Sequence, residues 1–159
     1  MTDTHALKEH LWEKFENGPF AMVGLSEGMS HFEPLTAQLD KDQVNTIWFF
    51  IGKNNRLAKG GRAAVNFVSK GQDFFASLSG HATLDNNPAM IDKLWSKQVE
   101  AWFPEGKADP NLALLRFDIA EAELWEADVS LVGQLKMLFG GTIAPDETGS
   151  HTVVSDTTI

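Results

Sequence analysis

The chain has 159 residues, is 43% hydrophobic and carries a formal net charge of −9 with no cysteine. This length suits a single domain with its own core, the absence of thiols excludes a disulfide framework, a thiolate metal site and a cysteine nucleophile, and the negative charge disfavours DNA or RNA as a partner. No apolar stretch approaches the length of a membrane span and residues 1–5 lack the layout of a signal peptide, so we expect a cytoplasmic protein that does not bind membranes.

The first half of the chain has the pattern of one helix followed by strands. Leu7, Leu11 and Phe15 recur at helical spacing and predict an amphipathic helix over residues 4–17, which Gly18 ends. Short apolar or alternating runs between turn residues then predict strands. The expected strands cover residues 20–25, 31–39, 46–51, 63–69 and 73–84, with a loop and short helix over 52–61 and a tight turn at Lys70 and Gly71.

The second half begins with a helical region. Asn87 suits the cap of a helix and Pro88 suits its first turn, and apolar residues at helical spacing follow. Residues 112–125 place apolar and polar side chains in alternation, which predicts a sixth strand. Residues 130–139 favour a final short helix or an extended segment.

Six strands with two or three helices indicate the fold class. Most connections are too short for crossovers between parallel strands, so the sheet is expected to be antiparallel and closed on itself. We expect a mainly β fold, a six-stranded antiparallel barrel with flanking helices, in one domain over residues 1–140. Residues 141–159 are expected to form a tail that is loose or packs on a dimer partner.

Positive charge is concentrated in one segment of this acidic chain. Residues 43–72 contain no Asp or Glu, yet they hold five cations. A solvated basic face that balances acidic helices explains this pattern. An anion site for a phosphate group explains it equally well. The cations are Lys53, Arg56, Lys59, Arg62 and Lys70.

The sequence motifs of the common enzyme classes are missing. The chain has no phosphate-binding loop, no glycine pattern for dinucleotides, no zinc-protease helix and no serine-hydrolase elbow. Its five histidines lack ligand spacing, so no metal site is expected. The sequence assigns no catalytic residue.

An aromatic strand directly precedes the first of the cations. A flavin nucleotide needs a clamp for its phosphate and a broad slot for its three-ring system. The run from Trp48 to Ile51, followed by Lys53, Asn55 and Arg56, could supply both within one short segment. This spacing suggests a flavin site.

Several short segments in a fixed order carry a family resemblance. They are residues 47–53 (IWFFIGK), 64–68 (AVNFV), 75–82 (FASLSGHA), 94–95 (LW), 102–106 (WFPEG), 109–110 (DP) and 122–125 (AELW). With these segments the chain resembles the split-barrel flavin-binding proteins related to pyridoxamine phosphate oxidase, in particular the bacterial general stress proteins. The resemblance extends over roughly residues 5–140.

This resemblance implies a split barrel that forms a homodimer, with two equivalent sites for flavin mononucleotide (FMN) at the subunit interface. The strand of residues 46–51 would line the flavin ring, and the cations after it would approach the phosphate. The implied cofactor contacts are Trp48, Phe49, Phe50 and Ile51 at the ring, Lys53, Asn55 and Arg56 at the phosphate, and Pro34, Thr36 and Lys70 as further candidates.

The chain departs from the family pattern in the second expected strand. The family usually has Arg-Pro-Met there, and its arginine helps to hold the cofactor, whereas this chain has Glu33, Pro34 and Leu35. A carboxylate beside a phosphate weakens binding by charge repulsion. Either Arg62 or Lys70 replaces the arginine, or Glu33 points elsewhere, or binding is weak.

Three functions are compatible with these observations. We favour a flavin-binding stress-response protein with a weak or unidentified redox activity. The alternatives are a flavin-dependent oxidoreductase, such as a reductase that uses NADH or NADPH, and a barrel without cofactor that serves as a binding module. Pyridoxamine phosphate oxidase activity is not expected, because its phosphorylated substrate would need a second cationic clamp.

Overall fold

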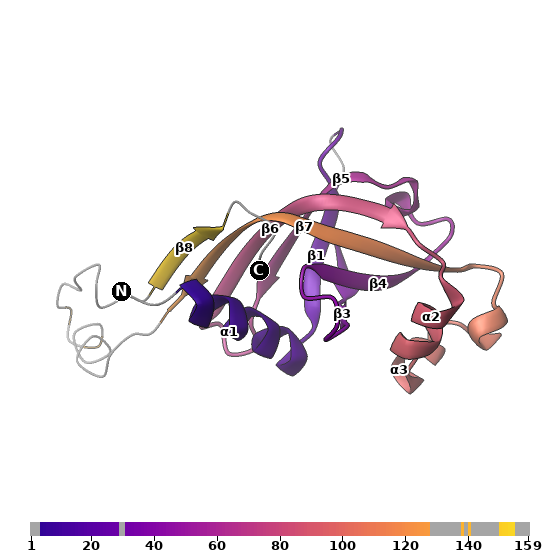
Figure 1. Cartoon of the computed structure of the whole chain (residues 1–159), viewed down its shortest axis with the longest axis horizontal. Coiled ribbons are helices and arrows are strands. Elements are labelled where there is room, and N and C mark those ends of the chain that lie inside the picture. The colour runs from indigo at the N-terminus through magenta and orange to yellow at the C-terminus, as the bar shows by residue number, and fades with distance from the viewer. Residues whose placement is uncertain (1–3, 29–30, 128–137, 139, 141–149, 155–159) are drawn as a thin grey trace.

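The computed structural model describes residues 4–28, 31–127, 138, 140 and 150–154. One long helix precedes the strands, and short helices interrupt them (Figure 1). The elements are α1 (Thr4–Asn17), β1 (Phe20–Leu25), β2 (Glu33–Thr36), β3 (Gln38–Leu39), β4 (Thr46–Gly52), the 3-10 helix η1 (Arg56–Lys59), β5 (Gly61–Val68), β6 (Phe74–Leu84), α2 (Pro88–Leu94), α3 (Lys97–Glu100), the 3-10 helix η2 (Gly106–Ala108), β7 (Leu112–Glu126) and β8 (Ser150–Val154).

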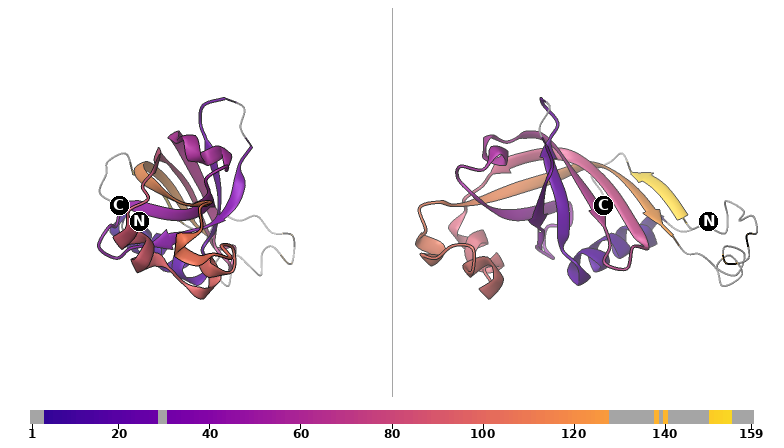
Figure 2. Two further views of the ribbon diagram at one scale, coloured as in Figure 1. Left: turned by 90° about the vertical axis from the view of Figure 1, so that its right-hand side faces the viewer. Right: turned by 180° about the vertical axis from the view of Figure 1, so that it is seen from behind.

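The strands form one antiparallel sheet in the order β2-β1-β5-β6-β7-β4-β3, with β8 beside β7. The strand expected over residues 31–39 is divided, since β2 pairs with β1 while β3 pairs with β4. Ala37 alone separates β2 from β3, so the two ends of the sheet meet and the sheet curls into a nearly closed barrel (Figure 2). The expected mainly β antiparallel barrel is thereby confirmed.

A seam remains where the barrel is split. One side of β2 pairs with β1, and no strand in the described part of the chain pairs with its other side, which contacts β4. The pairing of β3 with β4 ends at Trp48, so residues 49–52 of β4 extend beyond it along the seam. On the sides of β2 and β4 that face the seam, main-chain groups therefore have no strand partner among the described residues, although β4 pairs with β7 on its other side.

The helix α1 covers one opening of the barrel interior. Its residues Leu7, Leu11 and Phe15 are buried, and the Phe15 ring stacks on Phe67 of β5 with ring centroids 4.0 Å apart. Each such buried side chain contributes about 1.5–3 kcal/mol of transfer free energy. The periodicity in the sequence therefore predicts both this helix and its buried face correctly.

Two short helices cover the outer face of β4 and β7. The expected helical region divides at Trp95, where the main chain is extended, and Ser96 Oγ accepts a hydrogen bond from Val99 N to begin α3. Beneath α2, Leu94 packs with Trp48 and Leu114 in a small cluster outside the main core. None of the described helices has the length and apolar character that a membrane crossing requires.

The expected tail contains a strand. Residues 150–154 form β8 and pair with residues 122–126 of β7, while the other residues of the expected tail, 141–149 and 155–159, lie outside the described residues. The pairing is stabilised because Val154 is buried against the core and the His151 ring stacks on Trp125, with centroids 5.2 Å apart. The segment expected as a final helix, residues 130–139, lies outside the described residues except for Leu138.

Candidate functional site

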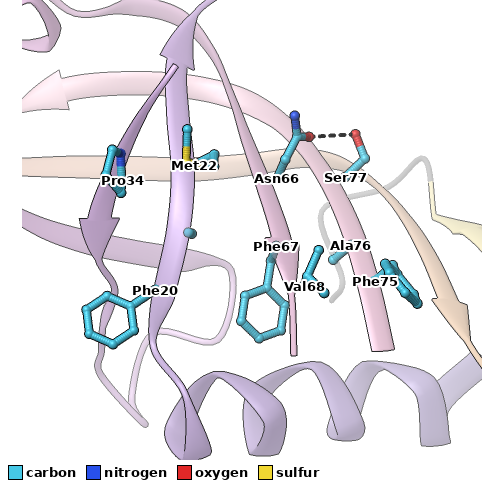
Figure 3. A pocket seen from close by; sticks show the side chains of 10 residues that line it. Phe20, Met22, Pro34, Asn66, Phe67, Val68, Phe75, Ala76 and Ser77 are labelled. Carbon is cyan, nitrogen blue, oxygen red and sulfur yellow. Dashed lines mark hydrogen bonds between the residues drawn. The ribbon is translucent and has the colours of Figure 1, made fainter. Parts of the chain in front are cut away.

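An open hollow of about 420 Å³ lies on the outer face of the barrel, across β1, β2, β5 and β6 (Figure 3). Strand alternation creates it, because Phe20 and Met22 of β1 point outward while Ala21 and Val23 are buried. Outward side chains of the neighbouring strands complete the wall. The apolar wall consists of Phe20, Met22, Pro34, Val68 and Phe75.

The two ends of this hollow differ in polarity. Figure 3 shows Phe20, Val68 and Phe75 at the end close to α1. At the other end, Ser77 Oγ donates a hydrogen bond to Asn66 Oδ1 at 3.1 Å. A flat ligand with one apolar end and one hydrogen-bonding end would match both.

A second group of residues lies at the seam, on the other face of β2. Consecutive strand residues point to opposite faces, so Pro34 faces the hollow while Glu33 lies on the side of the buried Val23. The Glu33 carboxylate accepts a hydrogen bond from Asn55 Nδ2 at 2.5 Å and pairs with Arg56 Nε at 2.9 Å. We call Glu33, Asn55 and Arg56 the seam corner.

The other predicted cations are distributed around this corner or far from it. In the part of the chain that the structure describes, no ion pair engages Lys53, Lys59 or Arg62, which are exposed. Lys70 lies in the turn after β5, at the end of that strand opposite to Arg62. The eight residues of β5 at roughly 3.3 Å each separate the two ends by on the order of 25 Å. Lys70 is therefore not part of the seam corner.

The four residues expected to line the flavin ring do not share one cavity in this chain. Phe49 and Ile51 are buried inside the barrel core, and Trp48 is buried beneath α2. Phe50 contacts Trp95 edge to face, with centroids 5.8 Å apart. What they can offer to a ligand is the main chain of β4 along the seam, and their contact with a flavin stays a prediction.

Pro34 and Thr36 are both on β2, at the edge of the sheet. Pro34 lines the hollow opposite Met22, and the half-buried Thr36 lies opposite Phe20. Of the predicted candidates, Pro34 is therefore the one that the structure places directly in the hollow. Its neighbour Glu33 connects the hollow to the seam corner.

The shape and chemistry of FMN can be compared with these two places. Its ring system has an apolar dimethylbenzene end and a pyrimidine end that donates and accepts hydrogen bonds, so the hollow suits it, with Asn66 and Ser77 toward the pyrimidine. The phosphate needs donors, but Glu33 already engages Asn55 and Arg56 and repels an anion. The ring therefore fits, whereas the phosphate does not fit as the corner stands.

No group of three or more metal-ligating side chains comes together among the described residues. Two carboxyl groups have clearly lowered pKa values, Asp40 through a hydrogen bond from Lys93 and Asp73 through one from Lys14. Both bonds join elements to each other, so they support the fold and suggest no catalytic role.

Sequence reasoning missed the residues that form the hollow, namely Phe20, Met22, Asn66, Val68, Phe75 and Ser77. The pairs Phe67 with Val68 and Phe74 with Phe75 carried a signal. Adjacent apolar residues on a strand place one on each face, so the outer face is apolar as well as the core. An apolar outer face in a strand that also has a buried face indicates a ligand or a partner.

Comparison with known proteins shows which family this chain resembles in sequence and in fold. The model of the family described as pyridoxamine 5'-phosphate oxidase like matches residues 6–144. A general stress family protein from Xanthomonas campestris pv. campestris is 40% identical with a TM-score of 0.75, covering 82% of this chain and 94% of its own. A general stress FMN/FAD binding protein from Xanthomonas citri is 43% identical with a TM-score of 0.75, covering 80% and 94%.

Two further relatives extend the comparison. The structure of general stress protein 26 from Jannaschia sp. CCS1 is 25% identical with a TM-score of 0.78, covering 96% of this chain and 99% of its own. General stress protein 26 of Bacillus subtilis is 36% identical over 55 residues, which are 35% of this chain and 39% of that protein. From its sequence and from its split-barrel fold, the chain belongs to the pyridoxamine 5'-phosphate oxidase-like family.

Proposed function

We propose that this chain is a flavin-binding stress-response protein, and that its cofactor is FMN. The observation that carries the proposal is the hollow on the outer face, which is apolar at one end and hydrogen-bonding at the other. The similarity to a general stress FMN/FAD binding protein at 43% identity supports it. The bound flavin would supply reversible electron transfer, with a redox activity that is weak or directed at an unidentified partner.

Each part of the site has a distinct task in this proposal. Phe20, Val68 and Phe75 would contact the apolar end of the ring, and Asn66 would hydrogen bond to its polar end. The main chain of residues 49–52 along the seam would contact the rest of the cofactor. None of these groups transfers protons readily, which agrees with a binding protein better than with an efficient acid-base catalyst.

A homodimer in the cytoplasm completes the proposal. The hollow is open, and its wall includes Phe20 at 69% exposure and Val68 at 52%. Large apolar side chains gathered on one face at such exposure mark an interaction surface. A second copy facing the first would cover both hollows, and each flavin would then lie between the two subunits.

The alternative is a barrel without cofactor that binds another partner, and Glu33 favours it because its carboxylate opposes a phosphate. A visible spectrum of the freshly purified full chain, followed by titration of FMN with its fluorescence recorded, separates the two. If the chain binds flavin, the purified protein should be yellow, or it should quench the fluorescence of added FMN saturably at micromolar concentrations. A colourless protein that leaves the fluorescence unchanged would contradict flavin binding.

A pair of valine variants locates the binding site. Val68→Glu places a charge in the hollow, whereas Val44→Glu places the same charge on a turn outside it, and the two valines are 52% and 53% exposed. We expect Val68→Glu to weaken FMN binding at least about tenfold, as an unpaired charge in an apolar site does. Equal affinity of the two variants would show that the ring binds elsewhere.

Redox activity is tested separately from binding. The flavin-loaded protein is mixed with NADH or NADPH under anaerobic conditions, and the yellow absorbance is followed. Bleaching within seconds would identify an oxidoreductase that uses a nicotinamide donor. Unchanged absorbance with both donors would contradict such a reductase and agree with the weak or unidentified activity that we propose.

A further inference from the structure

The Glu33 carboxylate occupies the seam corner in the way that a bound anion would. Its two oxygens accept from different donors, Oε1 from Asn55 and Oε2 from Arg56. The Glu33 side chain is 18% exposed, while that of Arg56 is 50% exposed. A charge from the chain itself thus uses the donors that a ligand phosphate would need.

Asn55 is held in this arrangement from its other side as well. Its Oδ1 accepts a hydrogen bond from Leu57 N at 2.8 Å and so caps the short helix η1, while its Nδ2 donates to Glu33. Leu57 is fully buried, which fixes η1 against the core. Turning Asn55 toward a ligand would break the cap, so the corner is built around Glu33.

The net charge of the corner is zero when Glu33 and Arg56 are paired. A phosphate group with a charge near −2 would lose hydration there and gain no matching cation. Lys53, Lys59 and Arg62 lie near in the chain, but all three are exposed, and exposed cations attract an anion only weakly in water. Glu33 does not weaken binding of the flavin ring, because the hollow that suits the ring is on the other face of β2.

We propose that Glu33 sets the ligand class of this site, which recognises the flavin ring and gains little or no affinity from a 5'-phosphate. Riboflavin therefore binds about as tightly as FMN. This inference rests on the proposed flavin binding and concerns its specificity. Glu33 is the specificity-determining residue, and it acts by occupying Asn55 and Arg56.

The test compares riboflavin and FMN as ligands of the full-length chain, freed of any co-purified flavin. Quenching of flavin fluorescence gives the dissociation constant for the original chain, Glu33→Gln and Glu33→Ala. In the original chain we expect the two constants to agree within about threefold, the scale of an exposed ion pair. In Glu33→Gln we expect FMN to bind at least about tenfold tighter, the scale of a hydrogen bond to a charged group, with riboflavin nearly unchanged.

Glu105→Gln serves as the matched control. It removes the same charge from an exposed position before η2, where the Glu105 side chain makes no capping hydrogen bond, and it should leave both constants unchanged. Thermal melting confirms that each variant is folded, and Glu33→Ala checks that the result does not depend on the amide of glutamine.

The outcomes separate the specificity from the function itself. If the original chain prefers FMN by more than about tenfold, or if both Glu33 variants leave the ratio unchanged, the role of Glu33 is refuted while flavin binding stands. If folded variants and the original chain bind neither flavin, the proposed flavin function fails and this inference fails with it. Similar binding of both flavins by the original chain, with FMN bound at least about tenfold tighter once Glu33 is replaced, would support the inference.

Discussion

Arg56 neutralises the carboxylate of the seam corner, so its removal should expose that carboxylate to a ligand. In Arg56→Ala, Glu33 keeps its hydrogen bond from Asn55 but loses the 2.9 Å pair with the guanidinium. We expect FMN to bind more weakly by about 1–3 kcal/mol, because the carboxylate that has lost its cation repels the phosphate. Riboflavin should lose much less, and calorimetry with both ligands measures the difference.

The control for Arg56→Ala is Lys97→Ala, which removes one positive charge from the exposed start of α3. It should change neither affinity, because exposed charges at a distance are screened. Equal FMN affinity in Arg56→Ala and the original chain would rule out a phosphate near Arg56.

Gly80 lies at the irregularity between β6 and β7, where the register shifts after Ser79. A Cβ atom at position 80 would be 1.9 Å from the main-chain oxygen of Asp118, which cannot move without disturbing the ladder. We expect Gly80→Ala to lower the free energy of unfolding by about 3 kcal/mol or more. Ser79→Ala, on the exposed face of the same strand, should change it by less than about 0.5 kcal/mol.

Urea unfolding of the two variants measures this difference. A Gly80→Ala protein as stable as Ser79→Ala would mean that β7 can shift away from β6 at this point. The bulge would then be a soft part of the barrel wall, and the close approach of the two strands would not be required for stability.

At the scale of elements, an ion pair between Lys93 and the buried Asp40 joins α2 to the turn between β3 and β4. The Asp40 side chain is 2% exposed and accepts from Lys93 Nζ at 2.7 Å and from the main-chain N–H of Asp42 at 3.0 Å. The hydrogen bond from Lys93, with that from Asp42, holds the pKa of Asp40 below its ordinary value of 3.8. The ionised form of Asp40 is therefore the one that the fold stabilises.

The sign of the pH dependence follows from this lowered pKa. The stabilisation is complete above the unfolded value of 3.8 and is lost as the pH falls through the lower folded value. At neutral pH we expect Asp40→Asn to lower the Tm by several degrees. The difference in Tm between the original chain and Asp40→Asn should become smaller as the pH is lowered below 3.8.

Asp42→Asn is the matched control, since Asp42 contacts the same Lys93 but its side chain is 84% exposed. Its Tm should stay close to that of the original chain at every pH, because exposed ion pairs contribute little. A similar loss for both variants would show that Lys93, and not the buried position of Asp40, determines the effect.

Local patterns in the sequence predict most elements, and tertiary pairing decides the rest. The periodicity of α1 and the aromatic run of β4 are strong local signals, and the structure has both elements where they are expected. By contrast, β8 is a five-residue segment in a part of the chain rich in Gly, Thr, Ser and Asp, and it forms a strand by pairing with the edge of β7. The division at Trp95 combines a local signal, the Ser96 cap of α3, with packing of Trp95 on Phe50 of β4, which only the tertiary structure provides.

The candidate site shows the same limit at the scale of the molecule. The sequence places Arg56 and Asn55 in a cationic segment, and the seam corner contains both. The family resemblance places Glu33 beside the phosphate, but it does not show that Glu33 binds Asn55 and Arg56 directly, because this contact requires the barrel to close through Ala37. The hollow likewise combines β1, β2, β5 and β6, and only the sheet order brings these strands together.

Apolar side chains continue beyond the hollow, across the outer face toward β8. Phe75 of β6 lies opposite Trp125 of β7, which in turn lies opposite His151 of β8. Phe75 and Trp125 are 36% and 37% exposed, and Val153 is 61% exposed. This stripe over several strands is larger than one flavin ring could cover, which favours a second protein surface on the same face.

Trp125 and Trp102 provide a test of the proposed homodimer with identical substitutions. Trp125 belongs to the stripe without lining the hollow, whereas Trp102, 81% exposed, follows α3 on the helices that cover β4. Trp125→Glu places a charge where two copies would meet, so sedimentation velocity should find a monomer. Trp102→Glu should sediment as the original chain does.

If each hollow is completed by the second copy, the Trp125→Glu monomer should also bind flavin more weakly, although its own hollow is intact. A dimer that survives Trp125→Glu would place the subunit interface on another face of the barrel.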